Sequence, residues 1–169
     1  MRDIREQVRY LSQTLDVTHH CWLFHHQNVE FAALARAVPE TTMVLDHFGT
    51  PLGVGPYESQ REQIFEQWKI DIAEAARCPN VVAKLGGLAM VVNGFDFQEN
   101  VLPPSSGELR DAWGPYMLAL IEAFGANRCM FESNFPVDRL SLSYTVYWNA
   151  MQKLAAPYSA AEQNAMFAG

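Results

Sequence analysis

Polar side chains that can do hydrolytic chemistry collect at the ends of four short apolar runs of this sequence. Histidine can carry a proton or hold a divalent metal, a carboxylate can activate water, and amides and lysine can bind a polar substrate. Burying so many polar groups in a core is costly unless each has a partner, so the pattern predicts a solvent-accessible site. The candidates are His25, Gln27, His47, Lys84, Glu132 and Asn134.

The apolar runs predict strands that are covered on both faces, because each run is short and apolar over most of its length. Helical spacing separates the runs, as at Phe31, Leu34 and Val38. Strands that alternate with helices predict parallel βαβ units, and therefore an α/β fold in a single domain over residues 1–169. The predicted strands are Cys21–His25, Met43–His47, Val81–Leu85 and Cys129–Glu132.

Parallel strands bring their carboxyl ends to one edge of a sheet, where α/β folds keep their chemistry. Alternate residues of a strand share a face, so we expect His25 and His47 side by side at this edge. Asp46 has the opposite parity to His47 and is expected to face the helices. His19 and His20 precede their strand and are expected at the surface.

The longer linkers, residues 48–60 and 86–105, follow strands and are rich in Gly and Pro. We expect the second of them to cover a substrate with Asn93. A plainer interpretation of the same residues remains open, in which the strand-end histidines are structural and hydrogen-bonded, and Lys84 pairs only with Glu132.

Composition narrows the classes of function. The net charge of −7 and the pI of about 5.1 give an acidic surface that repels phosphates, so nucleic acid is not an expected partner. No stretch approaches the ~20 apolar residues that a membrane span requires, and the charged N-terminus does not resemble a secretory signal. Three scattered cysteines suit reduced thiols, so a cytoplasmic protein is expected.

Four stretches in this order resemble the amidohydrolase-related proteins of the metal-dependent hydrolase superfamily, in the branch of the lactone hydrolases and some decarboxylases. The stretches span residues 20–140, and they read CWLFHHQ, MVLDHFGTPLG, PNVVAKLGGLAMVVNGF and FGANRCMFESNFPVD. The family fold is a (β/α)8 TIM barrel. The resemblance implies that this chain is a partial barrel of about four βα units, matching strands five to eight. The family's first-strand His-x-His pair is not found, so the chain is expected to be a fragment of a longer barrel.

The resemblance also implies roles for the residues. His25 and His47 match the fifth- and sixth-strand histidines, and would be catalytic or hold a divalent metal, Zn or Mn, with a metal-free site as the alternative. Gln27, Lys84 and Asn93 would bind the substrate. The expected ligand of these three residues is a small molecule.

Asn134 and Glu132 would be catalytic by the same resemblance, although Asn134 stands where many relatives have an aspartate. An amide cannot take a proton from water, which leaves Glu132 or Asp138 as the acid that substitutes for it.

The leading hypothesis is a hydrolase that acts on a lactone or another cyclic ester, with a small carboxylated or lactone substrate. Two alternatives stay open. One is a catalytically impaired barrel fragment with a structural role, which associates as a homodimer through its exposed sheet edges. The other is a decarboxylase of the same superfamily.

Overall fold

The computed structural model describes residues 4–15 and 17–168. Its centre is a four-stranded parallel sheet whose strands lie in chain order, β1-β2-β3-β4. Each strand is a neighbour of the next, as the alternation of strands and helices predicts. The strands are β1 (His19–Cys21), β2 (Met43–Leu45), β3 (Val81–Leu85) and β4 (Cys129–Phe131).

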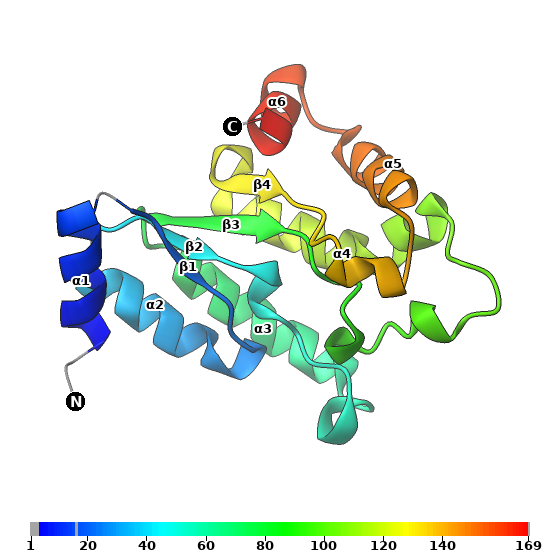
Figure 1. Cartoon of the computed structure of the whole chain (residues 1–169), viewed down its shortest axis with the longest axis horizontal. Coiled ribbons are helices and arrows are strands. Elements are labelled where there is room, and N and C mark those ends of the chain that lie inside the picture. Colours follow the sequence, from blue (N-terminus) through cyan, green and yellow to red (C-terminus); the bar gives the residue numbers. More distant parts are fainter. Residues whose placement is uncertain (1–3, 16, 169) are drawn as a thin grey trace.

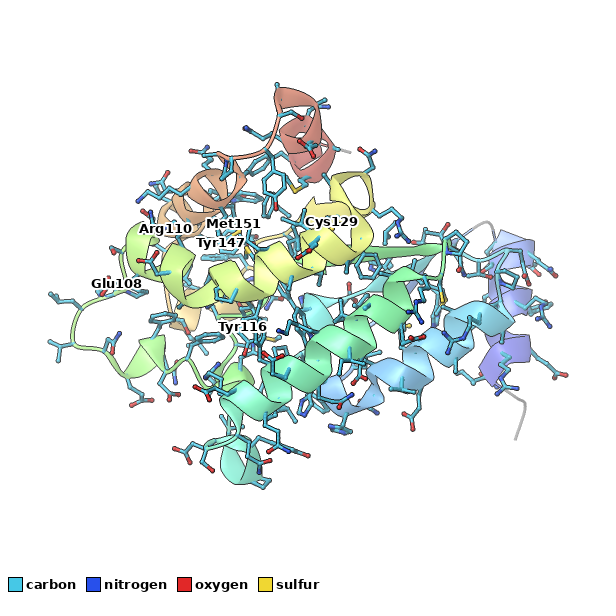
Figure 2. All side chains as sticks on the ribbon, turned by 180° about the vertical axis from the view of Figure 1, so that it is seen from behind. Glu108, Arg110, Tyr116, Cys129, Tyr147 and Met151 are labelled. Atoms are coloured by element: carbon cyan, nitrogen blue, oxygen red, sulfur yellow. The ribbon has the colours of Figure 1, made fainter. Side chains whose placement is uncertain are left out.

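Helices cover one face of this sheet. In Figure 1 α2, α3 and α4 lie behind the strands, and in the reversed view of Figure 2 they lie in front of them. The helix α5 packs on α4, with Tyr147 and Met151 fully buried. The helices are α1 (Ile4–Leu15), α2 (Asn28–Ala37), α3 (Arg61–Ala76), α4 (Ser106–Phe124), α5 (Tyr144–Ala155) and α6 (Ala160–Ala168). Within the described ranges, no helix is long and apolar enough to cross a membrane.

The strand register decides which residues face the helices. Leu45 pairs with Ala83, and both side chains are fully buried under the helix layer. Val44 therefore pairs with Val82 on the other face, and the next residues along that face are Asp46 and Lys84. This face corresponds to the inner wall of a barrel, and it leads directly to the carboxyl ends of the strands.

The opposite end of the sheet is held by side chains that donate to several carbonyls at once. Asn80 Nδ2 donates to the carbonyls of Ala35, Val38 and Thr41, at 2.9–3.1 Å. The Arg128 guanidinium donates to carbonyls that include Ala76 O at 2.9 Å. These contacts tie the helix ends to the strand starts and leave the carboxyl ends free to carry loops.

Three predicted strands end earlier than expected. β1 covers His19–Cys21 in place of Cys21–His25, β2 stops at Leu45, and β4 stops at Phe131, one residue before Glu132. The polar residues His19 and His20 are tolerated in β1 because it lies at the edge of the sheet. His25 and His47 therefore both follow their strands, in short 3-10 turns at His25–Gln27 and His47–Gly49.

Candidate functional site

A cluster of charged side chains lies at the carboxyl ends of β2, β3 and β4. Lys84 Nζ is 3.1 Å from Asp46 Oδ1 and 3.2 Å from Glu132 Oε2. Burial opposes the charge on Lys84, but its two carboxylate neighbours outweigh this and raise its pKa. Lys84 is therefore a fixed cation that bridges the ends of the two strands beside its own.

His47 joins the cluster through Glu132. His47 Nδ1 is 2.6 Å from Glu132 Oε1, and the two side chains are only 16% and 18% exposed. Burial disfavours the charged ring, but Glu132 and Asp46 outweigh it and hold the pKa of His47 above its usual value. Burial likewise works against the Glu132 carboxylate, but His47 and Lys84 outweigh it and lower its pKa. With His47 protonated, two cations balance two carboxylates.

The backbone places His47 there by leaving the strand. Its φ is +52°, and that of Phe48 is +60°, in the left-handed region that non-glycine residues rarely adopt. Gly87 makes room for the ring, because a Cβ at Gly87 would lie 2.6 Å from His47 Nδ1. At Gly86 a Cβ would collide with the Glu132 carbonyl oxygen. The Gly-Gly pair thus lets the end of β3 approach both groups.

The expected parity of Asp46 was wrong. Asp46 continues the face that carries Lys84 and contacts its ammonium group. β2 was expected to reach His47, which would turn Asp46 toward the helices, whereas the strand ends at Leu45. The pairing register of β2 with β3 shows that Asp46 lies on the inner face, and this register cannot be read from the sequence.

His20 is a neighbour of the cluster that sequence reasoning missed. Its Nδ1 is 3.5 Å from Asp46 Oδ1, on the inner face of β1. The sequence did hold a signal for this position, because His20 directly precedes the apolar run that begins at Cys21. A strand at a sheet edge needs less apolar material than a central one, so the run alone did not mark where β1 begins.

His25 lies in a different environment at the end of β1. It is 8% exposed, its Nδ1 accepts the backbone N–H of Leu52 at 3.2 Å, and its ring meets Tyr57 edge-on at 5.2 Å. Burial, followed by the charge of His26, lowers the pKa of His25. In the described part of the chain, neither a hydrogen bond nor a ring contact joins His25 to His47. Both residues lie beyond their strands, and their side-by-side placement stays a prediction.

Gln27 and Asn93 use their side chains to hold the backbone. Gln27 Oε1 accepts the N–H of Phe24 at 3.0 Å, which closes the turn after β1. Asn93 is 1% exposed, and its Nδ2 donates to Gly87 O at 2.8 Å. Arg61 of α3 donates to the carbonyls of Asn93 and Gly94, and its guanidinium lies over the Phe95 ring. Substrate binding by Gln27 and Asn93 stays a prediction.

Asn134 and Asp138 form a second polar pair beyond β4. Asn134 Nδ2 donates to Asp138 Oδ1 at 2.8 Å, and Asp138 is fully buried. Burial raises the pKa of Asp138 to about 7, although Asn134 and the charge of His47 act in the opposite direction. The charges of the cluster therefore affect the pKa of Asp138, although Asp138 forms no ion pair with the described residues of the cluster.

The described residues do not fit a metal centre by themselves. They contain no group of three or more His, Cys, Asp or Glu side chains that could hold an ion. Because the backbone N–H of Leu52 donates to His25 Nδ1, the neutral ring carries its proton on Nε2, and neither nitrogen is left for a metal. The expected metal pair of His25 and His47 does not suit this arrangement, so no step below passes through a metal.

Comparisons with known proteins agree on one family. The sequence pattern of the amidohydrolase family matches residues 12–169. The chain is 36% identical over 145 residues to the uncharacterized protein y4mH of Sinorhizobium fredii, covering 86% of this chain and 42% of that protein. It is 27% identical over 168 residues to an L-fucono-1,5-lactonase of Burkholderia multivorans, covering 99% of this chain and 53% of that one.

Solved structures give the same result. An amidohydrolase of Burkholderia multivorans with bound HEPES matches with a TM-score of 0.84 at 27% identity, over 100% of this chain and 56% of that one. A crystal structure of an amidohydrolase from the same organism with bound zinc matches at 26% identity, also with a TM-score of 0.84. The chain spans about half the length of the relatives it matches. Its four βα units are therefore a partial TIM barrel, as expected.

Proposed function

The chain belongs to the amidohydrolase family, and on that premise we propose that it carries the site of a hydrolase that opens a lactone or another cyclic ester. The observation that carries the proposal is the contact between His47 and Glu132 at the carboxyl ends of the strands. It supplies a positioned proton at the edge where barrel enzymes keep their chemistry. The relative named an L-fucono-1,5-lactonase supports a sugar-type lactone as the substrate class.

The reaction needs a proton for the leaving group. Water adds to the lactone carbonyl carbon and the ring C–O bond breaks. His47 gives the released ring oxygen a proton and regains one from the attacking water, so lactone and water give a hydroxy acid. Glu132 occupies Nδ1 of His47, which leaves Nε2–H of the charged ring as the donor for the carbonyl or the ring oxygen. Because Glu132 and Asp46 raise the pKa of His47, against the effect of burial, the ring keeps this proton to a higher pH than an ordinary histidine does.

The balance of charge supports a neutral substrate. Lys84 is held between Asp46 and Glu132, and His47 lies against Glu132, so the cluster offers no uncompensated cation to attract a carboxylate. Of the two expected substrate types, a lactone with hydroxyl groups suits this cluster better than a carboxylated one. The carboxylate oxygens of the cluster can accept hydrogen bonds from such hydroxyls.

The test is lactone hydrolysis by the purified chain. L-Fucono-1,5-lactone is followed by acid release at pH 7 against the spontaneous rate, with and without added Zn²⁺ or Mn²⁺. We expect protein-dependent turnover that His47→Gln removes, and slower turnover of a lactone that carries carboxylate groups. Absence of turnover in every condition, or a preference for the carboxylated lactone, would contradict the proposal.

A second candidate role is self-association, and the sheet favours it. β1 pairs only with β2, and β4 pairs only with β3, so the described sheet ends in two edges. Unpaired edges are templates for pairing with another chain. Light scattering after gel filtration over a hundredfold range of concentration tests this role. A dimer that persists in His47→Gln would support a structural function, and a monomer at all concentrations would oppose it.

A further inference from the structure

The pair formed by Asn134 and Asp138 lies beside the proposed proton donor but is not used by it. Asn134 follows Glu132 by two residues, and its φ of +50° turns the chain so that the Asp138 N–H returns to the Asn134 carbonyl at 3.2 Å. Asparagine is among the few residues that tolerate this conformation. The turn brings the Asp138 carboxyl group back to the Asn134 side chain.

The burial of the two side chains is unequal. Asp138 is fully buried, and Asn134 is only partly so. Asn134 Nδ2 points to the buried partner and donates a hydrogen bond to Asp138 Oδ1 at 2.8 Å. The amide oxygen of Asn134 accepts no hydrogen bond from the described residues, and it is not among their buried polar atoms without a partner. When Asp138 is ionised, its carboxylate oxygen beside Nδ2 excludes the flipped amide, because two acceptors would then face each other.

We propose that Asp138 is a positioning residue of the site, which fixes the Asn134 amide with Nδ2 turned inward and Oδ1 left as a hydrogen-bond acceptor. A neutral amide oxygen can accept a proton donor but cannot remove its proton. The class of ligand group it fits is therefore a hydroxyl group of the substrate or a water molecule, and not a carboxylate. This inference rests on the proposed function for its ligand, but the positioning step itself does not need turnover.

The positioning step is tested by NMR on the side-chain amide of Asn134. In the native chain, we expect two separate Asn134 NH₂ signals with slow solvent exchange. Asp138→Asn keeps an acceptor at the same place, so these signals should remain. Asp138→Leu removes the acceptor, and the exchange should accelerate by at least about tenfold. Equal exchange in the native chain and in Asp138→Leu would overturn the proposal, whether or not the chain hydrolyses a lactone.

The consequence for the ligand is tested with the lactone used above. Asp138→Leu and Asn134→Ala should each raise KM by roughly 10- to 100-fold, as loss of a supporting partner commonly does. The double variant should be no worse than either single one, because both changes remove the same acceptor. Asp138→Asn should stay within about threefold of the native KM. Additive losses, or an unchanged KM in Asn134→Ala, would overturn the ligand assignment.

A control variant separates positioning from loosening of the turn. Ser141 is also buried in this segment, and its hydroxyl donates to Ala89 O at 2.7 Å. Ser141→Ala should lower the thermal stability while leaving the Asn134 signals and KM unchanged. If Ser141→Ala moves KM as far as Asp138→Leu does, the effect belongs to the segment as a whole and the proposal fails.

Discussion

The carboxyl edge of the sheet contains two regions that use histidine in opposite ways. At the end of β1, His25 lies among rings and accepts a backbone N–H, and burial lowers its pKa. At the ends of β2 to β4, His47 lies among charges, and the contributions of Glu132 and Asp46 raise its pKa despite burial. Each of the two histidines is the first residue of a 3-10 turn that follows its strand.

The difference shows that the partner of Nδ1 decides the role of each ring. A backbone N–H can only donate, so it keeps His25 neutral and closes one nitrogen. A carboxylate accepts, so it favours a charged His47 and leaves Nε2–H as a donor. On the proposed function, the end of β1 thus forms a wall of the site, and the cluster around Glu132 is its chemically active part.

Exchanging each histidine for glutamine should give the largest contrast between the two regions. His47→Gln is expected to lower kcat by roughly 10²- to 10³-fold, within the range for loss of a general acid. His25→Gln keeps an acceptor near Leu52 N, and it should lower kcat by less than about tenfold. Steady-state kinetics on the lactone measures both. A larger loss in His25→Gln would reverse the comparison.

Removing the lysine should show how much the charged region depends on balance. Lys84→Met leaves Asp46 and Glu132 without their shared cation, and we expect a loss of about 2–4 kcal/mol in the free energy of unfolding. Lys84 is 20% exposed, which reduces the effect below that of a fully buried pair. The matched control is Lys69→Met, because Lys69 pairs with the exposed Glu66 and should lose at most about 1 kcal/mol. Urea denaturation of both variants decides between these values.

A glycine comparison should test the close approach of β3 to His47. Gly87 and Gly55 both have positive φ, +86° and +58°, so alanine costs about 1–2 kcal/mol of backbone strain at either position. Only at Gly87 would the new Cβ meet the His47 ring, since nothing lies within 4 Å at Gly55. Gly87→Ala should therefore also lower kcat by roughly tenfold or more, as a displaced group does. Equal kcat values in the two variants would show that activity does not depend on the close approach of Gly87 to the His47 ring.

The smallest expected effect is a difference in titration. Proton NMR of the imidazole rings should find His47 titrating above its ordinary value of 6.5 and His25 below it. Because the pKa of His47 is raised on folding, its pairing stabilises the fold fully below pH 6.5. That contribution is lost as the pH rises through the pKa of the folded state. In His47→Gln the corresponding fall in stability should be absent, and a fall that persists would point to another group.

Much of the fold could be predicted because it depends on local patterns. Apolar runs and helical spacing gave four parallel βα units in the correct order, and the capping box of Ser105 and Glu108 is formed. Proline inside a helix commonly kinks or breaks it, and Pro115 lies in the middle of α4. α4 nevertheless runs unbroken from Ser106 to Phe124, with Tyr116 and Met117 buried against neighbouring elements. Tertiary packing outweighs the local cost there.

The site was harder to predict because it depends on register and on backbone turns. The contact between Lys84 and Glu132, which was one of the open alternatives, is formed, although Lys84 also contacts Asp46. Asp46 was misplaced because one-residue shifts in a strand reverse the face of every side chain. His20 is exposed, as expected, but it lies within β1 and not before the strand. The positive φ of His47 and of Asn134 leaves no signal in apolar spacing, and these two turns decide which groups meet.

The loop after β3 is built in two parts with different tolerance to change. Its stem, residues 86–94, is pinned by Arg61 and by Asn93, which returns to the carbonyl of Gly87 beneath the His47 ring. Its tip carries Val101 and Leu102, which are 99% and 77% exposed. Insertions and exchanges at the tip would leave the proton donor undisturbed, whereas the stem cannot lengthen without moving it. We therefore expect changes of substrate selectivity among related chains to come from substitutions and insertions at the tip, while the stem is kept.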